Sequence, residues 1–134
     1  MPELHISKVA VGCDSLDALR ARVEARREGA RVAIVTRFRP KRADALVGGS
    51  LFWIVKHRLV ARQEIFGFEE RESDRRTLIW LSAELVPVEL RLKRAHQGWR
   101  YLDPREAPPD AGSADGLTAL PSDVARELAR LALI

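Results

Sequence analysis

Cysteine and histidine are scarce in this sequence, and their scarcity excludes several kinds of site. Cys13 is the only cysteine among 134 residues, so the chain has neither an internal disulfide nor a metal site built from several cysteines. The three histidines, His5, His57 and His96, show no spacing typical of metal ligands. A single thiol fits a reducing compartment. We therefore expect no metal and no other cofactor in this protein.

Long apolar runs and complete catalytic motifs are also missing. No segment approaches the ~20 apolar residues that a membrane-spanning helix needs. The first residues lack the basic start and the apolar stretch of a signal peptide. Gly48 and Gly49 stand without the remaining residues of a phosphate-binding P-loop. The sequence therefore predicts a cytoplasmic protein without a membrane partner, and it carries no motif that names a reaction.

What the chain does have is an ordinary globular composition with a basic balance. Hydrophobic residues make up 46%, which suffices for a core at this length. The 23 lysines and arginines exceed the 19 acidic residues and give a net charge of +4. That excess favours anionic partners only modestly, so the placement of the charges matters more than their total.

Hydrophobic patterning predicts a succession of strands with few helices. Strands are expected at residues 4–11, 32–38, 51–55, 59–68, 77–81 and 85–92. Asp14 or Ser15 can cap a first helix that ends at Gly29, and a short second helix follows Pro40 and ends at the Gly48-Gly49 pair. Gly67 marks a candidate bulge.

The element order predicts an α+β fold in a single domain, residues 1–134. Consecutive strands joined by short turns favour antiparallel pairing. We expect a mostly antiparallel curved sheet or partly closed barrel, flanked by two or three helices, of the kind found in PUA-like RNA-binding modules and their ASCH relatives. Residues 103–118 read as a Pro/Gly-rich linker to a C-terminal helix that Ser122 caps and that packs on the domain.

A basic cluster precedes the short second helix. Its members are Arg37, Arg39, Lys41 and Arg42, and only Asp44 opposes them. Lys56 and Arg62 follow on the next two strands. In one interpretation these side chains line one face and contact phosphates, with the salt dependence that counterion release produces. In the other they are solvated charges balanced by nearby glutamates such as Glu64.

A second basic run contains two aromatic residues and no acid between residues 90 and 102. Arg94 and Arg100 belong to it, and Trp99 and Tyr101 flank Arg100. Such a pattern could stack an unpaired base while arginines hold the backbone. We expect Tyr101 in the core and lean slightly towards a stacking role for Trp99. Trp53, within the apolar run 51–55, is expected in the core. We further predict that both basic runs face the same side of the sheet.

Several motifs in a fixed order resemble one known family. They are Lys8-Val9-Ala10-Val11-Gly12, Thr36-Arg37, Pro40-Lys41-Arg42, Gly48-Gly49-Ser50-Leu51-Phe52-Trp53-Ile54-Val55-Lys56, Arg62-Gln63, Glu84-Leu85-Val86-Pro87, Gln97-Gly98-Trp99-Arg100-Tyr101-Leu102, Ala107-Pro108-Pro109-Asp110 and Arg126-Glu127-Leu128-Ala129. With them the chain resembles the bacterial family catalogued as domain of unknown function 1489, nearly end to end. Phe52 replaces an expected tyrosine and His57 an expected glycine. The resemblance supplies domain bounds and implies no activity.

Three hypotheses for function follow from these observations. The first is a basic nucleic-acid-binding module, with RNA favoured over DNA. The second is a small hydrolase-like enzyme acting on a nucleotide-like or phosphorylated substrate, in which Thr36, a desolvated Lys41 and Glu64 would meet in a pocket. The third is an adaptor whose apolar C-terminal helix docks a protein partner.

Overall fold

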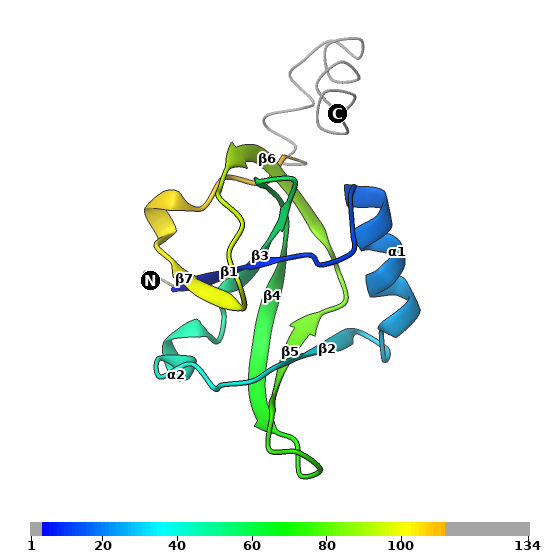
Figure 1. Cartoon of the computed structure of the whole chain (residues 1–134), viewed down its shortest axis with the longest axis vertical. Helices are drawn as coiled ribbons and strands as arrows, with labels where there is room; N and C mark the ends of the chain where they lie inside the picture. Colours follow the sequence, from blue (N-terminus) through cyan, green and yellow to red (C-terminus); the bar gives the residue numbers. More distant parts are fainter. Residues whose placement is uncertain (1–3, 112–134) are drawn as a thin grey trace, which may run out of the picture.

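The computed structural model describes residues 4–111 and has an α+β fold dominated by one sheet (Figure 1). The predicted C-terminal helix and the later part of the predicted linker lie outside these residues. In chain order the elements are β1 (His5–Val9), α1 (Leu16–Arg26), β2 (Arg31–Thr36), α2 (Ala43–Leu46), β3 (Ser50–Val55), β4 (Arg58–Glu70), β5 (Thr77–Ser82), β6 (Val86–Leu92), β7 (Trp99–Leu102) and the 3-10 helix η1 (Pro104–Glu106).

The sheet runs in the order β2-β5-β4-β3-β1-β7, and β6 pairs with β4 beside this path. All of these pairs are antiparallel except that of β1 with β3, which is parallel. The first strand of the chain is thus inserted between the third and the last. The antiparallel α+β prediction is confirmed, and within residues 4–111 no helix is long and apolar enough to cross a membrane.

The start of α1 follows from its sequence. The Ser15 hydroxyl accepts a hydrogen bond from the Ala18 N–H at 3.1 Å, which satisfies one of the free donors at the helix start. Leu19 and Val23, one turn apart, are buried against the sheet. The opposite side of the helix carries exposed charges such as Asp17 and Glu24.

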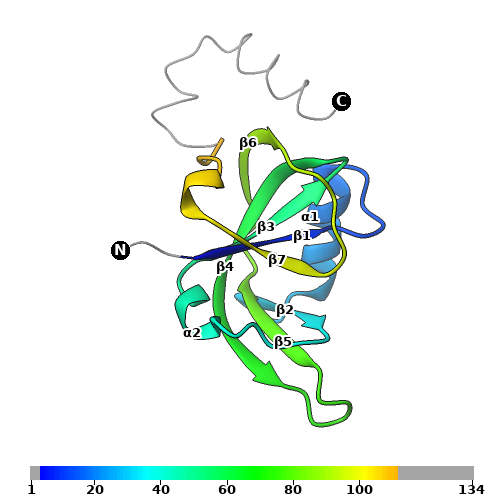
Figure 2. The same ribbon diagram turned by 60° about the vertical axis from the view of Figure 1, so that its left-hand side comes forward.

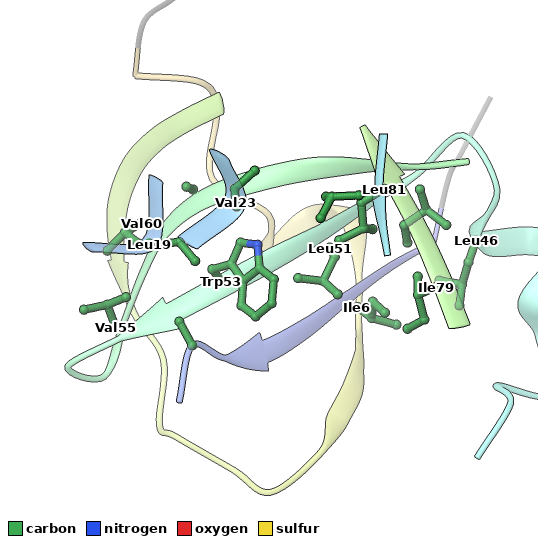
Figure 3. Packing of buried hydrophobic residues seen from close by; sticks show 14 residues of the cluster. Ile6, Leu19, Val23, Leu46, Leu51, Trp53, Val55, Val60, Ile79 and Leu81 are labelled. Carbon is green, nitrogen blue, oxygen red and sulfur yellow. The ribbon is translucent and has the colours of Figure 1, made fainter. Parts of the chain in front are cut away.

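Strand β3 is buried along its whole length and separates two clusters of core side chains. Leu51 and Trp53 belong to the larger cluster, together with residues of α1, β2 and β5 (Figure 3). Phe52 and Ile54 alternate onto the other face and pack with Leu102 in the smaller cluster. The unbroken apolar run 51–55 therefore predicted a strand buried on both faces correctly.

The Gly48-Gly49 pair ends α2 and starts β3 at a tightly packed point. Gly48 has a left-handed φ of +91°, which glycine adopts at no steric cost. A Cβ at Gly49 would lie only 2.1 Å from the backbone oxygen of Leu4, so the two segments approach too closely for any larger residue. The pair is a structural turn that places α2 against β4, because the Gly48 N–H donates to the Ile65 oxygen and the Ile65 N–H donates to the Gly49 oxygen.

The segment that follows β7 is fixed to the domain as far as Ala111. The Glu89 N–H donates to the Pro109 oxygen, and the Ala111 N–H donates to the Pro87 oxygen. The Asp110 carboxylate accepts two hydrogen bonds from the Arg62 guanidinium, at 2.7 and 2.8 Å. This part of the predicted linker thus covers the β4–β6 side of the sheet.

Replacing Asp110 with asparagine should lower the free energy of unfolding by about 1–2 kcal/mol, because Arg62 loses its paired charge in a half-buried position. Arg62 holds the pKa of the Asp110 carboxyl below its ordinary value of 3.8. The pair therefore stabilises the fold fully above that value, and its contribution is lost as pH falls through the lowered native pKa. Urea denaturation should show a gap between wild type and variant at pH 7 that narrows below about pH 4. Equal stability at pH 7 would contradict this role.

Candidate nucleic-acid interface

The residues between β2 and α2, 37–42, form an exposed positively charged loop, called here the basic loop. Its four cations are Arg37, Arg39, Lys41 and Arg42, called here the loop cations. Each is exposed, and none makes an ion pair with a carboxylate within residues 4–111. Their charges are therefore available to an anionic partner.

An aromatic side chain stands between two of these arginines. Phe38 is 70% exposed, so its ring faces solvent. The Arg39 guanidinium lies 5.8 Å from the ring centre of Phe68, within the range of a cation–π contact. The sequence prediction overlooked Phe38 because it extended the second strand through residue 38, whereas β2 ends at Thr36. The Arg-Phe-Arg pattern was the available signal.

Strand β7 contacts the basic loop through its two aromatic residues. The Tyr101 hydroxyl accepts a hydrogen bond from the Arg42 backbone N–H at 3.0 Å. The Trp99 ring N–H points to the Phe38 oxygen at 3.4 Å, and the Trp99 and Tyr101 rings meet edge to face, 5.0 Å apart. Part of the second basic run thus lies beside the first.

Burial differs from the expectation for one of these rings. Tyr101 is 38% exposed, so its assignment to the core was wrong. As the outermost strand beside β1, β7 leaves this ring covered only on one side. Trp99 is half-buried and packs against the larger core cluster, and Trp53 is buried as predicted. Trp99 therefore supports the loop from below, while Phe38 and Tyr101 present ring surface to solvent.

Arg100 points away from this surface. Side chains alternate along a strand, so Arg100 lies on the face opposite Trp99 and Tyr101. Arg100 on β7 is paired with Ser7 on β1, and Ser7 is paired with Phe52 on β3. Phe52 is in turn paired with Arg62 on β4. Arg100 and Arg62 therefore share the other face of the sheet. Arg62 is engaged there with Asp110 and with the Ser50 hydroxyl.

Lys56 and Arg94 form a separate basic area at the other end of β3. Lys56 lies in the β3–β4 turn, where it and His57 both have left-handed φ angles of 51° and 60°. The His57 backbone oxygen accepts a hydrogen bond from the Lys93 N–H, and the His57 Nδ1 accepts one from the Ala95 N–H. These two bonds bring Arg94 beside the turn. This area lies at the end of β3, whereas the basic loop contacts Trp99 and Tyr101 on β7.

The predicted site residues therefore divide among several places. The basic loop and Trp99 come together, Lys56 and Arg94 come together elsewhere, and Arg62 and Arg100 occupy the opposite face. The sequence prediction placed both basic runs on one side of the sheet. The register of β7 splits the second run, so only its aromatic pair joins the basic loop.

Thr36, Lys41 and Glu64 are the residues considered for catalysis. Lys41 and Glu64 are exposed, and no hydrogen bond joins either of them to Thr36. A different pair, unanticipated from sequence, is Ser7 and His96, whose Oγ and Nε2 lie 2.9 Å apart. Ser7 is completely buried beneath the β6–β7 connection, so its hydroxyl is not open to a substrate. Burial lowers the pKa of His96. This contact ties the connection to β1.

Comparison with known proteins places the chain in a family. The model of the family described as protein of unknown function (DUF1489) matches residues 6–134. The chain belongs to this family. No curated protein and no solved structure matches it at the threshold used for a significant similarity. Membership in the family confirms the resemblance seen in the sequence motifs, and its description assigns no activity, so the geometry of the basic loop carries the functional argument.

Proposed function

We propose that this member of the family is an RNA-binding module that holds single-stranded RNA across the basic loop and the exposed rings of Phe38 and Tyr101. The observation that carries the proposal is the exposed Phe38 ring between Arg37 and Arg39, neither of which forms an ion pair within residues 4–111. Proteins bind single-stranded nucleic acids with cations along the backbone and aromatic side chains that stack on the bases.

The contacts from β7 support a preformed site. The hydrogen bond from Arg42 N–H to Tyr101 holds one end of the loop, and Trp99 packs beneath its middle. A loop that is fixed before binding loses less conformational entropy when RNA orders it. We further propose that the curved sheet is the partly closed barrel of a PUA-like module. The protein would then be a cytoplasmic bacterial protein.

Replacing Phe38 with alanine should weaken binding of a labelled single-stranded RNA by about 1–3 kcal/mol, the range found for a base stacked on an aromatic ring. The melting temperature should hardly change, because an exposed ring contributes little to the core. Fluorescence anisotropy titration and a thermal melt measure the two effects on the same samples.

Leu92 offers a matched control for this experiment. It is 80% exposed, and β6 lies at the end of the molecule away from α2 (Figures 1 and 2). Leu92→Ala should leave RNA affinity unchanged. If Phe38→Ala binds RNA as tightly as wild type, or if Leu92→Ala loses as much affinity, the basic loop is not the stacking surface.

A further inference from the structure

A cavity of about 280 Å³ lies between α1 and the sheet, on the face that carries the larger core cluster. Apolar walls come from α1, β2 and β3, with Val23, Val32 and Trp53 among them. Figure 3 shows Trp53 in the same cluster as Leu19 and Val23. None of the loop cations lines this space, so it is distinct from the proposed RNA surface.

Three cations surround the same cavity. Lys8 reaches it from β1, and Arg22 and Arg26 reach it from successive turns of α1. Within residues 4–111 none of the three makes an ion pair with a carboxylate. Burial of the Lys8 ammonium lowers its pKa, and the nearby positive charge of Arg22 lowers it further. An anion bound between them would relieve this repulsion.

The backbone leaves room for one of these guanidinium groups. A Cβ at Gly12 would lie 2.9 Å from Arg22 Nη2, and Gly12 has a left-handed φ of +83°. The glycine therefore allows the turn after β1 to pass directly against the Arg22 side chain. The Arg22 guanidinium, whose side chain lines the cavity, therefore lies beside this turn.

The side-chain amide of Gln63, which also lines the cavity, already has hydrogen-bond partners within the protein. The Gln63 side chain accepts from the Trp53 ring N–H at 2.7 Å and donates to the Ser82 oxygen at 2.8 Å. The cavity thus offers apolar surface inside and positive charge around it. A pocket with apolar walls and cations at its border suits a ligand that has an apolar body and a negatively charged end.

We propose that this cavity binds a small phosphate monoester whose apolar ring enters between α1 and Trp53 while Lys8, Arg22 and Arg26 hold the phosphate. A phosphate suits three cations better than a carboxylate, because it carries nearly two negative charges at neutral pH and three acceptor oxygens. The volume limits the body to about one ring, since pockets for larger ligands begin near 300 Å³.

Isothermal titration of the full chain with phenyl phosphate tests the proposal, with inorganic phosphate and phenol as the two partial ligands. Phenyl phosphate should bind more tightly than either. Arg22→Gln should weaken it by about tenfold or more, as expected for a charge-assisted hydrogen bond. Arg20→Gln removes the same charge from the same helix outside this cavity, and it should change the affinity less than twofold.

Several outcomes would overturn the proposal. These are absence of phenyl phosphate binding, binding no tighter than that of inorganic phosphate, or equal losses in Arg22→Gln and Arg20→Gln. Arg26→Gln repeats the test if Arg22→Gln fails to fold, as judged by circular dichroism. Phe38→Ala should bind phenyl phosphate as wild type does, so failure of this proposal and failure of RNA binding are separate results.

Discussion

Replacing the four loop cations together with glutamine should lower the affinity for single-stranded RNA about a thousandfold at 50 mM salt. Each phosphate contact to a single strand contributes about −0.7 to the slope of log affinity against log salt, so the slope should become less negative by about 3. The fold should persist, because these side chains are exposed and make no ion pair within residues 4–111. Titrations between 50 and 200 mM salt measure both quantities.

A charge-matched variant separates a local site from general attraction. Arg20 lies on α1, Arg27 directly after it, Arg91 on β6 and Arg105 in η1, and all four are exposed and outside the basic loop. Changing these four to glutamine gives the same net charge as the loop variant. We expect a weak loss of affinity that falls well short of the loss in the loop variant. Equal losses of affinity in the two variants would show that RNA binding depends only on the net charge of the protein.

Replacing Trp53 with alanine should lower the free energy of unfolding by about 3–5 kcal/mol. The side chain is only 6% exposed and packs in the larger core cluster. Its loss would leave a cavity and remove the donor to Gln63 Oε1. Chemical denaturation measures the effect.

Two milder variants show which part of Trp53 matters. Trp53→Phe keeps a ring but leaves the Gln63 oxygen without its partner, which should cost about 1–3 kcal/mol. Trp99→Ala removes a half-buried ring from an outer strand and should cost less than Trp53→Ala. A loss below about 1 kcal/mol in Trp53→Ala would contradict the packing described here.

Local signals in the sequence predicted most of the elements. Ser15 caps α1, and the register of β4 against β5 shifts between Ile65 and Gly67, where a bulge was expected. Strand β7 was not predicted. It has four residues and follows the polar Gln97-Gly98 pair, so neither length nor alternation distinguishes it. Its existence depends on pairing with β1, which is about 90 residues away in the chain.

The same long-range pairing explains what the sequence could predict of the site. The loop cations were recognised because they are neighbours in the chain. Their position beside Tyr101, and the separation of Arg100 onto the other face, depend on β1 lying between β3 and β7. Nothing local specifies that order. The cavity beside Lys8 was missed for the same reason, since its three cations come from different elements or different turns of one helix.

The most direct test of RNA binding by the basic loop is a map of backbone amide shifts by nuclear magnetic resonance, recorded while a uridine octanucleotide is titrated in at low salt. The account predicts that the largest shifts fall on residues 37–42 and on Tyr101, with little change around Lys56 and Arg94. Shifts confined to the β3–β4 turn, or no shifts at all, would contradict it.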